Sequence, residues 1–220
     1  MEAPSDLPAF LDWLRMRTEE AWSMAEPATL ADYGRRGVGG AEAQRGTRWK
    51  PLGSEELTAI ETREGPLPPS LRVYLLHLGG TDRPQVGAAY RGATLERVER
   101  PLFYDWRDAS SIEEAREAVL SGLEFDAEQG WWPASSVRPA TAIERRQQLA
   151  AILAAAPKLW PIVGHRHLVG DAVLSIHQSD IILWGRDLRS ALLRELASVV
   201  GRTNQVFDAE LPPIPFWGDF

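Results

Sequence analysis

Apolar residues recur every three or four positions along six segments of the chain, which is the spacing of one face of an α-helix. The clearest case is the run of Leu71, Tyr74, Leu75 and Leu78, after which Gly79-Gly80 supplies a helix stop. The other five segments each follow residues that can cap a helix N-terminus or open a capping box: Asp6, Ser54, Ser111, Thr141 and Asp187. The pattern therefore predicts six helices, the last of them closed by Gly201.

Short apolar runs replace the helical pattern toward the end of the chain. Residues 159–164, 172–178 and 180–184 form β-type runs, and the last two are close enough to pair as a hairpin across Gln178-Ser179-Asp180. Weaker signals predict short strands near 86–90 and 102–104. Helices and strands together predict an α+β protein.

The chain has no internal repeat and no linker long enough to separate two domains, so its 220 residues predict a single domain spanning 1–220. Residues 31–47 are rich in glycine and arginine and lack periodicity, which predicts an exposed loop. The tail at 203–220 contains Pro212, Pro213 and Pro215, so we expect it to lie extended over the body of the protein rather than form a regular helix.

Composition narrows the classes of function. Hydrophobic residues make up 44% of the chain and charged residues 25%, a balance typical of a globular protein. The chain has no cysteine, which excludes disulfides, thiol catalysis and cysteine-ligated zinc. The longest apolar stretches are too short or too charged to span a bilayer, and the acidic N-terminus lacks the basic region of a signal peptide. We therefore expect a cytoplasmic protein that does not bind membranes.

The net charge of −7 favours one kind of partner over another. This field would repel a phosphate backbone, so nucleic acid is not an expected partner. A basic protein would be attracted instead, and the field would speed its encounter with this chain.

Three histidines near the predicted strands are candidates for a metal site. His165 and His167 would share one face of a strand, and His177 lies on a nearby run. Three converging imidazoles would suit zinc, which keeps a metal-dependent hydrolase as a third hypothesis. The spacing is nonspecific and no carboxylate pattern completes it, so the favoured interpretation is that these side chains satisfy local backbone groups.

The chain lacks the motifs of the common catalytic and nucleotide-binding sites. It has no nucleophile elbow, no phosphate loop, and no glycine motif placed between a strand and a helix as a dinucleotide fingerprint requires. We therefore expect no catalytic residue and no cofactor.

Nine tryptophans are the unusual feature of the composition, and several lie beside acidic residues in segments without clear periodicity. Tryptophan is enriched at binding hot spots, but it also fills irregular cores, and packing is the favoured interpretation for any single one. As a set, these segments supply a candidate partner-binding surface: Asp105, Trp106, Asp108, Asp126, Glu128, Trp131 and Trp132.

Two blocks of the sequence stand in a recognisable order and spacing across roughly residues 49–196. The first contains Trp49-Lys50-Pro51-Leu52, Glu55-Glu56-Leu57, Leu67-Pro68-Pro69-Ser70-Leu71-Arg72, Tyr74-Leu75 and Gly79-Gly80. The second contains Trp160-Pro161-Ile162-Val163-Gly164-His165-Arg166 and then Ala172-Val173-Leu174-Ser175-Ile176-His177, continuing through Asp180-Ile181-Ile182-Leu183-Trp184 to Asp187-Leu188. Together they resemble the SUKH superfamily, which is named after a yeast regulator of cell-wall synthesis.

The resemblance implies both a fold and a role. It implies an α+β fold with a small, mainly antiparallel sheet flanked by helices, in which Leu67, Pro68, Tyr74 and Gly80 are structural positions. Bacterial members are similar to immunity proteins, so a cognate toxin domain is the expected protein partner, and the acidic charge suits a basic toxin. A regulatory or scaffold protein that binds a host protein is the alternative. No catalytic residue set carries over, and the oligomeric state stays open.

Overall fold

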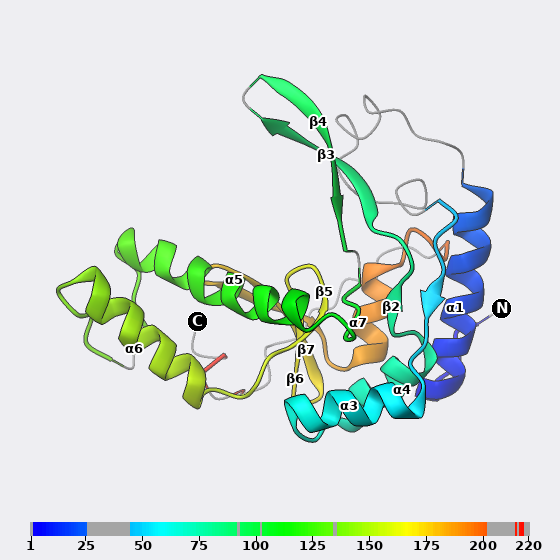
Figure 1. Ribbon diagram of the computed structural model, residues 1–220, viewed down its shortest axis with the longest axis horizontal. Helices are drawn as coiled ribbons and strands as arrows, with labels where there is room; N and C mark the ends of the chain where they lie inside the picture. The colour runs from blue at the N-terminus through cyan, green and yellow to red at the C-terminus, as the bar shows by residue number, and fades with distance from the viewer. Residues whose placement is uncertain are drawn as a thin grey trace. The chain divides into compact units, whose positions relative to one another are not determined.

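The computed structural model describes residues 2–25, 45–91, 93–101, 103–133, 136–201, 214 and 216–217 (Figure 1). Within these ranges the chain forms six helices and eight strands, and all strand pairs of the three sheets are antiparallel. The fold is therefore α+β, as the sequence predicts. None of the described helices is long and apolar enough to cross a membrane. Most of the predicted loop at 31–47 and of the predicted tail at 203–220 lies outside the described residues.

The chain divides into two compact units, each made of two stretches of sequence. Unit 1 comprises Met1–Arg107 with Leu192–Val206, and unit 2 comprises Asp108–Ala191 with Phe207–Phe220. Helix α7 (Leu188–Glu195) begins in unit 2 and ends in unit 1. Because each unit consists of two stretches of sequence, neither unit is one continuous segment of the chain. The single domain expected for 1–220 stays a prediction.

Unit 1 is mainly helical with two short sheets. Its elements in chain order are α1 (Leu7–Met24), β1 (Trp49–Lys50), α3 (Ser54–Glu64), α4 (Pro69–His77), β2 (Gly80–Thr81), β3 (Gln85–Arg91) and β4 (Thr94–Arg100). Strand β1 pairs with β2, and β3 pairs with β4 as a hairpin. The strand predicted near 86–90 is therefore present, whereas Phe103 in the run near 102–104 forms only an isolated bridge.

A cluster of three aromatic side chains with mutually tilted rings holds β1 in the core of unit 1. The ring centroids of Trp22 and Trp49 lie 5.5 Å apart, and those of Trp49 and Phe103 lie 4.6 Å apart. The Trp49 indole N–H donates to Thr18 Oγ1 at 2.8 Å, so its polar edge is satisfied inside the core. These three aromatic residues join α1, β1 and the segment that follows β4 into one packed layer.

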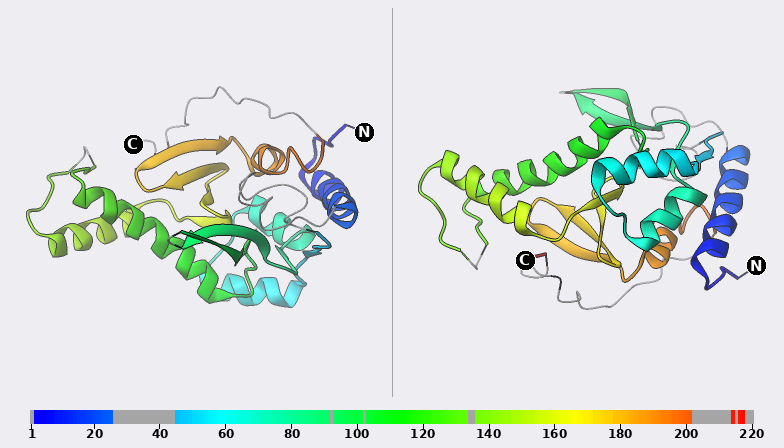
Figure 2. Two further views of the ribbon diagram at one scale, coloured as in Figure 1. Left: turned by 90° about the horizontal axis from the view of Figure 1, so that it is seen from above. Right: turned by 60° about the horizontal axis from the view of Figure 1, so that its bottom comes forward.

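Unit 2 is a four-stranded antiparallel meander packed against a pair of helices. The helices are α5 (Ala109–Glu128) and α6 (Ala142–Ala155), and the strands are β5 (Trp160–Val163), β6 (Arg166–Val169), β7 (Ala172–His177) and β8 (Asp180–Gly185). The predicted hairpin is confirmed, because His177 pairs with Asp180 across a turn in which Gln178 adopts a φ of 59°. Figures 1 and 2 show α5 and α6 side by side and antiparallel.

One face of α5 builds the core of unit 2. Val119, Leu123 and Ala127 recur at helical spacing and pack in one cluster with residues of β7 and β8 and with Trp217. At the hairpin turn, Asp126 accepts hydrogen bonds from the backbone N–H and the hydroxyl of Ser179, at 2.8 and 2.5 Å. These contacts attach the C-terminal half of α5 to the tip of the β7–β8 hairpin.

Helix capping follows the sequence at three of the five predicted positions. Asp6, Thr141 and Asp187 each accept a backbone N–H at the start of α1, α6 and α7. Ser54 is not a cap, because the cap position is Gly53, whose N–H donates to Glu56 at 2.7 Å.

The start of α5 differs from the prediction. The helix begins at Ala109 rather than after Ser111, because the Asp108 carboxylate accepts the N–H groups of both Ser110 and Ser111. A carboxylate two residues before Ser110 and three before Ser111 can accept both of these otherwise unpaired amide N–H groups, so the helix starts earlier than the serines predict. The end of α7 differs as well, because regular helix stops at Glu195 and turns lead on to Gly201.

The capping assignment for α5 predicts different effects for two alanine substitutions. Asp108→Ala removes the acceptor of two helix N–H groups, so we expect the Tm to fall by about 2–4 °C. Ser111→Ala removes only a hydroxyl that donates to Asp108, so its effect should be clearly smaller. Thermal unfolding followed by circular dichroism gives both values. A larger fall in Tm for Ser111→Ala than for Asp108→Ala would show that Ser111 is the cap, as the sequence predicts.

Candidate functional site

The structure divides the predicted partner-binding residues between the two units. Asp105 and Trp106 belong to unit 1, and the other five belong to unit 2: Asp108, Asp126, Glu128, Trp131 and Trp132.

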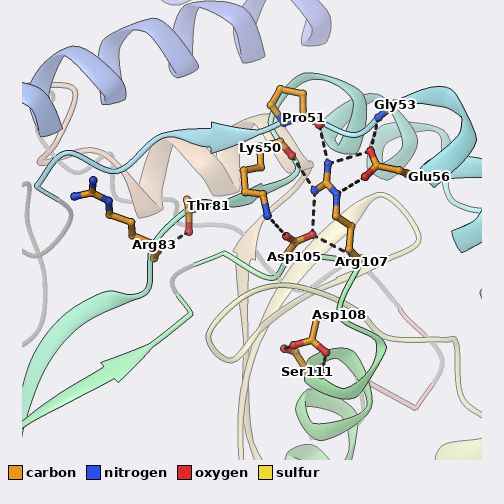
Figure 3. A network of polar contacts seen from close by, with 10 residues as sticks. All are labelled: Lys50, Pro51, Gly53, Glu56, Thr81, Arg83, Asp105, Arg107, Asp108 and Ser111. Carbon is orange, nitrogen blue, oxygen red and sulfur yellow. Dashed lines mark hydrogen bonds and ion pairs between the residues drawn. The ribbon is translucent and has the colours of Figure 1, made fainter.

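In unit 1 the predicted residue Asp105 belongs to a network of polar contacts centred on Arg107 (Figure 3). Its guanidinium binds Glu56 through two hydrogen bonds, Nε to Oε1 at 2.5 Å and Nη2 to Oε2 at 3.0 Å. Nη1 also donates to Asp105 and to the carbonyl of Lys50, and Nη2 donates to the carbonyl of Pro51. One side chain thus joins β1, the start of α3 and the segment that follows β4.

The carboxylate of Asp105 is used inside this network. It accepts from Lys50 Nζ at 2.9 Å and from the backbone N–H and Nη1 of Arg107. Burial alone would raise the pKa of Asp105, but the hydrogen bonds from Lys50 and Arg107 outweigh burial and lower it. The negative charge is therefore neutralised within the fold.

Two glycines let the backbones of this region approach closely. Gly79 has a φ of +61°, and a Cβ there would lie 2.1 Å from the Lys50 carbonyl oxygen. A Cβ on Gly80 would lie 2.7 Å from the Cα of Asp105. No other residue type fits these contacts without moving the backbone. Gly80, one of the SUKH-like positions, is thus needed for close packing, whereas the glycine with positive φ after the end of α4 is Gly79.

The other SUKH-like positions are also structural. Leu67 is buried, Pro68 is the residue directly before α4, and Tyr74 is fully buried in that helix. Burial raises the pKa of the Tyr74 phenol, and the nearby Asp105 charge adds to this effect.

Trp106 is not part of a binding surface. Its side chain is 0% exposed, and its carbonyl accepts a hydrogen bond from Arg63 at 3.0 Å. A fully buried indole offers no area to a partner, so this predicted contact residue is a core residue instead.

The predicted three-histidine cluster does not form. The rings of His165 and His177 meet edge to face with centroids 5.8 Å apart, but His167 is only 1% exposed and lies in the core. Strand β6 begins at Arg166, so the turn at Gly164-His165 breaks the two-residue alternation on which the prediction depended. Among the described residues, no three histidine or carboxylate side chains are placed to hold a metal ion.

Two of the predicted acidic residues of unit 2 have structural partners. Asp126 binds the hairpin turn through Ser179, and Asp108 caps α5. Glu128 is half exposed and pairs with Arg145 at 2.8 Å.

The two adjacent tryptophans, Trp131 and Trp132, are half-buried against the core of unit 2. The Trp132 indole donates to Ser136 Oγ at 3.0 Å, and the Trp131 backbone N–H donates to the carbonyl of Asp126. Both follow the C-terminal end of α5 in the sequence, and part of each side chain stays accessible to solvent.

The residues that stand out on the surface of unit 2 are ones that sequence reasoning missed. Phe125 on α5 is 55% exposed, and Ile143 on α6 is 71% exposed. Both line a groove of about 360 Å³ between the two helices, together with Glu124, Glu128, Arg145 and Arg146. In the sequence, Phe125 falls outside the helical spacing of the buried stripe of Val119, Leu123 and Ala127. That position is the sequence signal that could have identified Phe125 as an exposed apolar residue.

Charge surrounds the apolar floor of this groove. Helix α5 carries six acidic residues and one arginine, whereas α6 carries one glutamate and two arginines. Arg146 bridges Glu117 at 2.8 Å and also contacts Glu124, and Arg145 pairs with Glu128. The groove thus combines exposed apolar side chains with two glutamates and two arginines, and Glu117, which also pairs with Arg146, leaves one carboxylate in excess.

The Arg107 network predicts a specific loss of stability. Arg107→Lys keeps the charge but removes the two-bond contact with Glu56 and the bonds to two carbonyls. We expect a loss of about 1–3 kcal/mol in the free energy of unfolding, measured by urea denaturation. Arg97→Lys is the matched control, because its single ion pair with Glu99 is exposed and should contribute less than about 0.5 kcal/mol. Equal effects of the two substitutions would contradict the structural role of Arg107.

His167 predicts a loss of stability in acid. Burial lowers its pKa to about 4 in the folded chain, although the backbones of His165 and Ala115 oppose the shift. The unfolded chain binds a proton near pH 6.5, so stability should fall as the pH drops from about 6.5 toward 4, by up to about 1.4 kcal/mol per pH unit.

His167→Leu should remove this part of the pH dependence of stability. The control His77→Gln, at a position whose side chain is 28% exposed, should retain it. Urea midpoints measured between pH 7.5 and 5 give the comparison. A variant with the native pH dependence would show that His167 is not the group responsible.

Comparison with known proteins identifies no relative of this chain. No protein-family model, curated protein or solved structure matches this chain. The SUKH resemblance therefore stays an expectation drawn from the sequence, and any function has to be argued from the contacts described above.

Proposed function

We propose that this chain is a non-enzymatic protein-binding module whose α5–α6 groove binds a basic protein. The observation that carries the proposal is the pair of exposed apolar side chains, Phe125 and Ile143, that line the groove. Large apolar side chains gathered at a groove and surrounded by polar groups are typical of protein interaction sites. A partner that inserts one apolar side chain here would bury both residues.

The charge of the groove supports a basic partner. Glu117 and Glu124 are both held by the single exposed Arg146, so a lysine or arginine of a partner could share or replace that contact. The net charge of −7 adds a long-range attraction that speeds the encounter. Complementary charge also disfavours acidic proteins, which would meet like charges at the rim.

An immunity protein is the role that fits these features best. Such a protein neutralises a toxin by direct binding, and a basic toxin would be matched by the acidic α5. The SUKH resemblance of residues 49–196 supports the same role. A regulatory or scaffold module of the cell-wall-regulator type would use the same groove for a host protein, so the identity of the partner decides between the two.

The groove predicts that two substitutions abolish binding without unfolding the chain. Phe125→Asp combined with Ile143→Asp places two carboxylates where apolar contacts are needed, so we expect retention of the partner to fall at least about tenfold. Affinity capture from the native host, with quantitative mass spectrometry of the retained proteins, compares this variant with the native chain.

The control is Val137→Asp, which changes an apolar side chain that is 87% exposed and does not line the groove. It should retain the partner at the native level. A basic toxin domain that is lost from the groove variant alone would support the immunity role. A host regulator lost in the same way would support the alternative, and a partner retained by both variants would exclude the groove.

A further inference from the structure

A second pocket lies at the opposite end of the helix pair. It has a volume of about 320 Å³, and it is lined by residues of α5, of the C-terminal end of α6 and of the segment leading into β5, together with Trp217. Because α5 and α6 are antiparallel, the first half of α5 faces the last half of α6 here. The groove described above uses the other halves, so the two sites share no lining residue.

The wall of this pocket is mainly apolar. Val119, Leu159 and Trp217 are buried members of the unit 2 core, and Leu153 packs against them. The Trp217 indole N–H donates to the carbonyl of Pro157 at 3.0 Å. This hydrogen bond satisfies the polar edge of the indole without water and fixes the orientation of the ring. Ala154 and Ala156 complete the wall with small side chains, and these leave the space open.

Two cationic side chains also line the pocket, although the net charge of the chain is −7. Arg116 is positioned by the carbonyl of Leu159 and by Glu113, at 3.4 and 3.3 Å. Lys158 is one of two lysines in the chain, and its ammonium lies 4.5 Å from the centre of the Trp160 ring. Within the described part of the chain, the residues that line the pocket include no acidic side chain, and Glu113 pairs with Arg116 from outside the lining. An apolar wall with positive charge is complementary to a molecule that has an aliphatic part and an anionic head.

We propose that this pocket binds a small amphipathic anion of the aliphatic carboxylate class. The aliphatic chain would lie against Val119, Leu153 and Trp217, and the carboxylate would be bound by Arg116 and Lys158. The volume suits this class, because it is about twice the roughly 150 Å³ cavity that holds benzene and lies at the lower end of the range for ligand pockets. A dinucleotide or other large cofactor would not fit.

The experiment uses decanoate below its micelle concentration, with decanol and decyltrimethylammonium as probes that share its chain but carry a neutral or a cationic head. Isothermal titration calorimetry of the full chain should show one site for decanoate. Affinity for decanol should be at least about tenfold lower, because the charge-assisted hydrogen bonds are lost. The cation should bind more weakly still.

Two variants test the assignment to this pocket. Arg116→Gln combined with Lys158→Gln should weaken decanoate binding at least about tenfold while leaving decanol affinity near native. Ala154→Trp fills the pocket from an exposed helix position, so it should abolish decanoate binding while the circular dichroism spectrum stays native. The groove variant with Phe125→Asp and Ile143→Asp should bind decanoate at the native affinity.

Three outcomes would overturn the proposal. These are no heat of binding for decanoate, equal affinities of the native chain for decanoate and decanol, and native decanoate affinity in Ala154→Trp. None of these results bears on the protein partner, so the pocket and the α5–α6 groove are tested separately.

Discussion

The burial of one stripe of α5 is the constraint on which the rest of unit 2 depends. Val119, Leu123 and Ala127 pack into the core with the sheet residues, and this fixes the rotation of the helix about its axis. Once the rotation is fixed, a second stripe formed by Ser121, Glu124, Phe125 and Glu128 must lie along the groove beside α6. The exposed position of Phe125 is thus a consequence of how the opposite face packs.

Most of the carboxylates predicted as binding residues stabilise the fold instead. Asp105 is held by Lys50 and Arg107, and Asp126 by Ser179. A carboxylate that already accepts several hydrogen bonds would have to lose them before it could bind a partner, which costs more than using a solvated glutamate. Glu117 and Glu128 are about half exposed and each pairs with one arginine, so a partner would have to replace fewer contacts there.

The antiparallel pair α5–α6 offers two chemically different sites. At one end, exposed apolar side chains lie beside three glutamates and two arginines, an arrangement that suits a basic protein. At the other end, an apolar pocket lined by Arg116 and Lys158 suits a small anion. The difference follows from which side chains of α5 line each site, because Arg116 lines the pocket whereas Glu124 and Glu128 line the groove. One helix can thus contribute a cation to one site and carboxylates to another without any change of fold.

The sequence by itself determined the α+β class, the caps at Asp6, Thr141 and Asp187, and the β7–β8 hairpin, because each of these depends on residues a few positions apart. Only the tertiary structure decided which aromatic residues are buried, since Trp106 and Trp131 look alike in sequence but differ in what packs over them. It also decided that His167 turns into the core while His165 does not, because a turn ends the strand alternation between them. Arg107 also binds Lys50, Pro51 and Glu56, which lie more than fifty positions away in the sequence, and no local pattern could have revealed those contacts.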